Sequence, residues 1–231
     1  MVLVPLLFGV VLGGAPEAHG CELIVRNLER SVQRFRDNPR SLSSPPSYRQ
    51  SGNRPGCKLP ANSRALLEGE SAPKGFHVGM LNERPAVAHL DGPGGSGRYW
   101  LVSLAVQTGK ELLGTCFDTS TVAWRNLYPV AEDVGPWQPF TEDGRFVLWL
   151  SVQGDPRGST ATFVLAPLVF RLDKNELVPD ISGTKAQLVR LAKIYAKSAS
   201  SQSKFRDLHQ NAAEAYHAWA HGKPCPSVAG D

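Results

Sequence analysis

One pattern repeats along the middle of the chain. Apolar runs rich in Val, Phe, Trp and Leu alternate with short stretches of Gly, Pro and Asp. Branched and aromatic side chains fit the pleated surface of a β-strand, and the intervening residue types favour turns. The runs cover residues 85–90, 98–107, 114–124, 145–153 and 159–172. This pattern predicts five strands and therefore a fold dominated by antiparallel sheet.

The predicted strands carry apolar residues on both of their faces. In the run 98–107 every second residue from Trp100 to Val106 is apolar, but Leu101 lies in the opposite register. A sheet that is partly buried on both faces packs against a second layer, as in a sandwich. Pro167, inside the last run, predicts a bulge or an edge strand because proline cannot donate a hydrogen bond to the ladder.

Helical periodicity lies on either side of the strand region. Apolar residues recur every three or four positions in 22–36, 184–199 and 203–220, which places them on one face of a helix. The two later segments predict an antiparallel helical hairpin. Residues 37–75 are rich in Pro, Ser, Gly and Asn, which predicts a long surface loop with one short helix near 62–69. The predicted fold class is α+β: an N-terminal helix, an antiparallel β-sandwich-like sheet and a C-terminal antiparallel helical hairpin.

Composition fits this organisation. Hydrophobic residues make up 42% of the 231 residues and charged residues 20%. These values exclude a disordered tail and a polytopic membrane protein. The predicted parts are 1–20, a signal peptide; 21–75, an amphipathic helix and a basic Pro/Ser-rich loop; 76–180, a β-rich core; and 181–231, a helical hairpin with a cysteine-containing tail.

The first twenty residues resemble an export signal. Residues 2–12 are apolar but too few to span a bilayer, which takes about 20 residues. Small residues follow, and Ala18 to Gly20 resembles a cleavage site just before Cys21, although no basic residue precedes the apolar run. A cysteine at this place also resembles a bacterial lipoprotein signal, in which Cys21 would carry the lipid. We predict an exported protein: periplasmic, cell-envelope or secreted. The alternative is an uncleaved N-terminal element of a cytosolic protein.

Four widely spaced cysteines bear on the same question: Cys21, Cys57, Cys116 and Cys225. They form no CxxC motif, so a structural zinc site is not expected. In an exported chain such cysteines predict disulfide bonds. Four cysteines allow three pairings, of which we favour Cys57 with Cys225, because each lies in a segment that lacks other anchors. In a reducing cytosol they would be buried thiols.

Positive charge is concentrated in residues 26–58, which hold eight basic and two acidic residues in a chain of net charge +4. Such a segment can attract phosphates or anionic lipids. Only Phe35 and Tyr48 interleave with the arginines, so the segment lacks the stacking platforms of nucleic-acid sites. We favour a solvated arm. Nucleic acid is not expected as a partner, and membrane contact is expected only through a lipid anchor or this arm.

No catalytic motif is found, and Gly92 to Gly97 matches the dinucleotide pattern GxGxxG only formally, because a predicted strand and not a helix follows it. GxSxG, Walker A and SxxK patterns are absent. A hydrolase stays open as an alternative, because histidines and carboxylates near strand ends could gather in one pocket: His77, His89, Asp91 and Asp118. A second possibility is that Cys116 is a nucleophile beside His77 or His89. Glu214, His217 and His221 share a helix face, but that face is expected to point at water. We therefore predict neither a metal nor a cofactor.

Aromatic residues gather in and beside the loop 129–144. They are Trp124, Tyr128, Trp137 and Phe140. Exposed aromatic side chains on a β-sandwich can stack on sugars or anchor a protein partner, although core packing also explains them. We predict that this loop binds another protein or a glycan.

Three functions follow from these features. The leading hypothesis is an exported, non-catalytic binding or accessory module, such as an envelope lipoprotein. The first alternative is an extracytoplasmic hydrolase with a His/Asp-based site, including His89 and Asp91. The second is a cytosolic protein that binds nucleic acid or a partner through residues 26–58.

Overall fold

The computed structural model describes residues 20–43, 62–73, 75–91, 99–120, 138–154, 163–201 and 205–226. The helices within these residues are α1 (Gly20–Asp37), α2 (Ser63–Leu67), α5 (Ile181–Ser201) and α6 (Arg206–His221). The strands are β1 (Arg40–Ser41), β2 (Phe76–Leu81), β3 (Arg84–Asp91), β4 (Tyr99–Thr108), β5 (Glu111–Ser120), β6 (Phe146–Gln153), β7 (Phe163–Asp173) and β8 (Glu176–Pro179).

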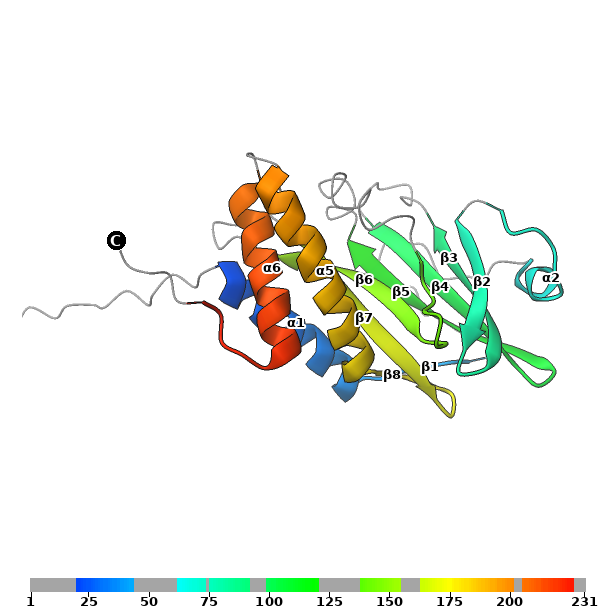
Figure 1. Ribbon diagram of the computed structural model, residues 1–231. Coiled ribbons are helices and arrows are strands. Elements are labelled where there is room, and N and C mark those ends of the chain that lie inside the picture. Colours follow the sequence, from blue (N-terminus) through cyan, green and yellow to red (C-terminus); the bar gives the residue numbers. More distant parts are fainter. Residues whose placement is uncertain are drawn as a thin grey trace, which may run out of the picture.

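The strands form two antiparallel four-stranded sheets. Sheet A has the order β1-β8-β7-β6, and sheet B the order β2-β3-β4-β5. The helices α1, α5 and α6 gather around one end of sheet A, and sheet B lies at the other end of the molecule (Figure 1). The predicted α+β class is therefore confirmed, with its N-terminal helix, sandwich-like sheets and C-terminal helix pair.

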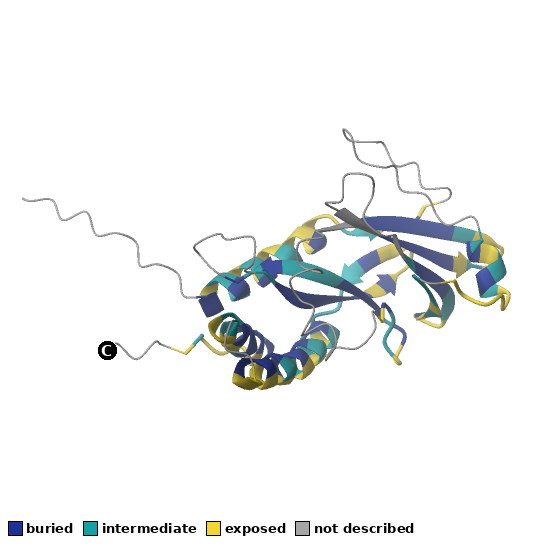
Figure 2. Ribbon diagram, turned by 90° about the horizontal axis from the view of Figure 1, so that it is seen from above, coloured by how far each residue is buried: buried dark blue, intermediate teal, exposed yellow. Residues whose placement is uncertain are grey.

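Two apolar clusters form the core. The first lies among α1, α5, α6 and the adjoining ends of β6 and β7, and it contains Ile24, Leu188 and Tyr216. The second lies between the two sheets and the C-terminal half of α1. Figure 2 shows the buried positions running along the sheets and the inner sides of the helices. Each helix is thus held by an apolar stripe rather than by its propensity alone.

The β8 side of β7 is completed by helices. β8 pairs only with residues from Phe170 onwards, so the preceding part of β7 has no neighbouring strand on that side. There Val169 N donates to the hydroxyl of Thr184 at 3.0 Å, and the backbone of Leu165 contacts two tyrosine hydroxyls of α5 and α6. Pro167 lies midway between these residues, where its missing N–H would face the helices. Pro167 therefore lies where β7 has no strand on its β8 side, as the predicted edge position requires. The alternative, a bulge, is wrong, because the pairing of β7 with β6 is unbroken.

Asn82 joins the two sheets. It begins the turn between β2 and β3 with a φ of 46°, a conformation that asparagine adopts more readily than most residues. Its Nδ2 donates to Leu172 O at 3.0 Å, and its Oδ1 accepts from Leu172 N at 3.1 Å. These bonds fall just beyond the last residue pair of β6 and β7, Phe146 with Phe170. The side chain therefore replaces a strand and anchors the hairpin of sheet B on sheet A.

A disulfide corrects the predicted cysteine pairing. Cys225 is bonded to Cys21, 204 residues away, and not to Cys57, which lies outside the described residues. Cys21 is buried on the apolar face of α1, where the chain after α6 returns to it. A sulfur held in a disulfide cannot also carry a thioether lipid, so the predicted lipidation of Cys21 is excluded in this state. Cys116 is disulfide-bonded as well. Disulfides are compatible with an oxidising compartment.

No helix in the described ranges is long and apolar enough to cross a membrane.

Candidate functional site

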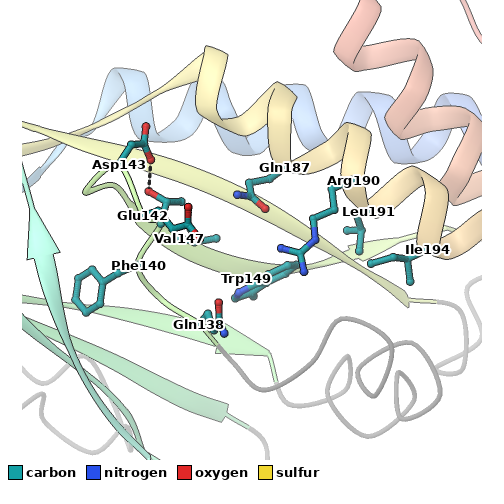
Figure 3. A pocket seen from close by; sticks show the side chains of 11 residues that line it. Gln138, Phe140, Glu142, Asp143, Val147, Trp149, Gln187, Arg190, Leu191 and Ile194 are labelled. Atoms are coloured by element: carbon teal, nitrogen blue, oxygen red, sulfur yellow. Dashed lines mark hydrogen bonds between the residues drawn. The ribbon is translucent and has the colours of Figure 1, made fainter.

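A cavity of about 380 Å³ opens between α5, β6 and the segment that precedes β6. Three walls surround it (Figure 3). Helix α5 contributes Gln187, Arg190, Leu191 and Ile194; β6 contributes Val147 and Trp149; residues 138–143 supply the rest. The volume falls within the range of small-ligand pockets, about 300–1,000 Å³.

The α5 wall follows from helical spacing. Gln187, Arg190, Leu191 and Ile194 are three or four residues apart, so they lie on one side of the helix. The next stripe around the helix, which includes Leu188 and Tyr195, packs into the core and fixes the rotation of α5. The apolar stripe thus determines which polar side chains reach the cavity.

Trp149 forms the floor on the β6 side. Its neighbour on β7 is Pro167, and both lie on the face of sheet A that α5 approaches. Figure 3 shows the guanidinium of Arg190 and the indole of Trp149 pointing toward one another. Among the described residues the indole Nε1 has no hydrogen-bond partner, and it is buried from solvent. A ligand in the cavity would therefore contact the indole ring rather than this N–H.

A tight turn builds the third wall. Thr141 Oγ1 donates to Asp143 Oδ1 at 2.5 Å and accepts from Arg145 N at 2.9 Å, and Gly144 adopts a φ of 72° that favours glycine. This turn places the exposed carboxylates of Glu142 and Asp143 at one end of the cavity. The cavity is therefore acidic at this end and has a cation at the α5 wall.

An ion pair fixes the turn against α5. Arg145 Nε lies 3.0 Å from Asp180 Oδ2, and Asp180 Oδ1 accepts from Gly183 N and Ser182 Oγ at the start of α5. Burial opposes ionisation of Asp180, but the hydrogen bonds from Gly183, Ser182 and Arg145 outweigh it and lower the pKa of this carboxyl. Asp180 stays ionised at neutral pH and caps the helix. The wall formed by residues 138–143 is thus fixed in position relative to the α5 wall.

One of the four predicted binding residues lines this cavity. Phe140 lies on its wall, whereas Trp124, Tyr128 and Trp137 lie outside the described residues. Trp149 and Arg190 also line the cavity but were not among the predicted site residues. Trp149 was included in a predicted strand, and Arg190 belongs to a charged helix face, so neither carried a local signal of binding.

The structure separates the two histidines of the hydrolase hypothesis. His77 is opposite Ala88 on β3, whereas His89 is opposite Phe76 on β2, so the two imidazoles lie on different faces of sheet B. Burial lowers the pKa of His77, and the ring of His89 is stacked on Phe76 at 4.0 Å. The second candidate nucleophile, Cys116, is disulfide-bonded and is not a free thiol. The register thus separates His77 from the other candidates, whereas the positions of His89, Asp91 and Asp118 fall on one face of sheet B, because Asp91 and Asp118 both pair with Leu101. A site built on His89 and Asp91 therefore stays an untested alternative.

A serine and a histidine do meet elsewhere, between α5 and α6. Ser198 Oγ and His209 Nδ1 are 2.9 Å apart, and their residues are 2% and 4% exposed. Burial lowers the pKa of His209, which keeps the imidazole neutral at pH 7. A substrate cannot reach this hydroxyl, so we interpret the pair as a buried hydrogen bond that aligns the helices.

A second, larger groove of about 870 Å³ runs along the outer side of α5 and α6. Its lining is mainly apolar and includes Ala192, Ala213 and the disulfide residue Cys225, with Lys193 and His217 among its polar residues. His217 is exposed, as predicted, and its ring lies 4.5 Å from that of His221. Among the residues that the structure describes, no group of three metal-ligating side chains comes together.

The basic segment is described only in part. Arg26, Arg30, Arg34 and Arg36 lie on the exposed face of α1, and residues 44–58 fall outside the described ranges. Exposed arginines on one side of an amphipathic helix are the ordinary arrangement.

Comparison with known proteins finds no matching family model, no matching curated protein and no matching solved structure. The function is therefore inferred from the residues of this chain alone.

Proposed function

We propose that the protein is an exported, non-catalytic binding module that holds a glycan in the cavity between α5 and β6. The observation that carries the proposal is the cavity itself, with an aromatic floor, a cationic wall and an acidic end fixed by the Arg145–Asp180 ion pair. The signal-like first twenty residues and the disulfide between Cys21 and Cys225 support the exported location.

The chemistry of the lining suits a sugar. A pyranose ring presents an apolar face of C–H groups, which matches the indole of Trp149, and a rim of hydroxyls that both donate and accept hydrogen bonds. The amides of Gln138 and Gln187 can do both, and Arg190 donates. Leu191 and other apolar residues complete the lining, so the cavity provides the mixture of contacts that a sugar unit needs.

Binding is best tested at the indole of Trp149. Its N–H gives one resonance in a ¹H–¹⁵N correlation spectrum, which the Trp149→Phe variant identifies. The oxidised full chain is titrated with neutral, amino and acidic mono- and disaccharides. We expect at least one class to shift this resonance saturably, because a sugar stacked on the indole ring changes the magnetic environment of its N–H.

Two charge-matched variants of α5 complete the test. Arg190→Ala removes a donor from the cavity, and loss of a hydrogen bond to a charged group weakens binding by about 10–100-fold. Lys193→Ala removes the same charge from a side chain that lines the outer groove instead, so it is expected to bind like the wild type. The proposal fails if no sugar moves the Trp149 resonance, or if the two alanine variants bind equally well.

A further inference from the structure

The edge strands differ in how they are protected. The outer side of β5 is covered at Gly114, which exchanges two backbone hydrogen bonds with Ser43, at 2.9 and 3.0 Å. The outer side of β6 is covered at Val147, whose N donates to Pro139 O at 2.7 Å. Edge strand β1 has only two residues. Edge strand β2 has six; its outer side is covered at Phe76, whose N donates to Pro73 O, and just past its end at Asn82, whose N donates to Gly144 O at 2.9 Å. Between these two points no described residue pairs with it.

The turn after β2 determines which backbone groups point outward. Leu81 and Arg84 flank a two-residue turn in which both residues have positive φ, and in such hairpins the flanking pair exchanges both hydrogen bonds. Counting back along β2, alternate residues bond to β3. The residues between them, Val78 and Met80, direct their N–H groups away from the sheet. Val78 also directs its C=O outward, so the ladder around Val78 is not filled by any residue that the structure describes.

The side chains of β2 do nothing to block that ladder. Natural edge strands are protected by charged residues, proline or bulges. The sequence Phe-His-Val-Gly-Met-Leu contains no Lys, Arg, Asp, Glu or Pro, and its register with β3 is unbroken. Val78 is 47% exposed and Met80 46%, and they are the large apolar side chains that stand out as exposed in the described part of the chain. Both lie on the same face of the strand as Phe76.

We propose that β2 pairs antiparallel with β2 of a second copy of this chain, about a two-fold axis at Val78. In this register Val78 faces the same residue of the other copy, and Met80 faces Phe76. Four hydrogen bonds form: two between the Val78 backbones, and one from each Met80 N to the partner's Phe76 O. The two remaining bonds of a full ladder would need Phe76 N, which already donates to Pro73 O.

The symmetry of the strand favours a second copy over a foreign peptide. The outward face Phe76, Val78, Met80 is apolar at every position, so a two-fold axis covers each exposed side chain with an apolar one. No charged group on β2 is present to select a peptide of other sequence. Two six-residue strands bury less than the area of about 1,200–2,000 Å² typical of stable complexes. The dimer is therefore weak and concentration-dependent.

Sedimentation velocity of the oxidised full chain across micromolar to millimolar concentrations tests the dimer. The wild type is expected to shift from monomer to dimer. Val78→Lys places two like charges opposite each other and is expected to stay monomeric. Val78→Pro removes only an outward N–H, which an edge strand tolerates, so it should fold and stay monomeric too. Ala196→Lys adds the same charge on an exposed face of α5 and is expected to dimerise like the wild type.

Amide exchange locates the interface. We expect the amides of Val78 and Met80 to become more protected as concentration rises, while their neighbour Gly79, already bonded to β3, changes little. A chain that is monomeric at every concentration overturns the proposal. So does a dimer that persists in both Val78 variants, because its interface then lies elsewhere.

Discussion

Replacing Tyr195 or Tyr216 by phenylalanine removes one hydroxyl and leaves the ring packing in place. Tyr195 Oη accepts from Leu165 N at 2.9 Å, and Tyr216 Oη donates to Leu165 O at 2.6 Å. Both tyrosines are fully buried and Leu165 is 2% exposed, so water cannot replace either bond. An unsatisfied buried polar group costs about 1–3 kcal/mol. We expect each variant to lose that much free energy of unfolding at pH 7.5.

The same hydroxyls make the loss depend on pH. Burial raises the pKa of both tyrosines above the ordinary value of 10.0, and for Tyr216 the neighbouring Tyr195 adds to the effect. In the unfolded chain they ionise as the pH passes 10, while in the folded chain they stay protonated, so stability falls as the pH rises. At pH 11 each tyrosine stabilises the unfolded state by about 1.4 kcal/mol. Phenylalanine does not ionise, so its unfolded state gains no such stabilisation at pH 11. The difference in free energy of unfolding between the wild type and each phenylalanine variant is therefore smaller at pH 11 by about 1.4 kcal/mol.

Guanidinium unfolding followed by circular dichroism at pH 7.5 and pH 11 measures both parts. Thr184→Val is the matched control, because Thr184 Oγ1 accepts from Val169 N on the same strand but does not titrate. Its deficit is expected to be the same at the two pH values. The reasoning is refuted if the phenylalanine variants lie within about 0.5 kcal/mol of the wild type at pH 7.5. It is also refuted if their deficits, like that of the control, do not change with pH.

Two further predictions concern the disulfide and export. The double variant Cys21→Ala/Cys225→Ala removes the bond that closes a loop of 204 residues. Chain entropy predicts that the free energy of unfolding falls by about 5 kcal/mol. A fall below about 1 kcal/mol, measured by denaturant titration, would contradict this prediction. The intact mass of the protein from its own host is expected to lack residues 1–20 and to rise on reduction as the disulfides gain hydrogens. A full-length mass with free thiols would contradict the proposed export.

Periodicity was enough to predict the long elements. The helices α1, α5 and α6 and the strands β3 to β7 all fall where apolar spacing placed them, because each buries a stripe or a face. Strands β2 and β8 were not predicted. β8 has four residues, too few for a pattern, and β2 contains Gly79. At that glycine the ring of Phe140 lies 2.5 Å from where a Cβ would be, so the absence of a side chain serves a close contact that only the structure reveals.

The candidate cavity was predictable only in part. The aromatic loop 129–144 pointed to the correct segment, since Phe140 lines the cavity. Its other wall comes from α5, more than forty residues later, and the two meet because Arg145 bonds to Asp180. Sequence spacing gives no information on such a contact. The cysteine pairing failed for the same reason, since the return of the tail from α6 to α1 is a tertiary event.

The bond between Cys21 and Cys225 also sets how the molecule can be oriented. It brings the two ends of the fold to one point at the helical end, and β2 lies toward the opposite end (Figure 1). A tether to a surface at either end of the fold would therefore hold the protein near the same point, the helical end. Sheet B would stand farthest from that surface, with the open side of β2 free to meet a neighbour tethered alongside.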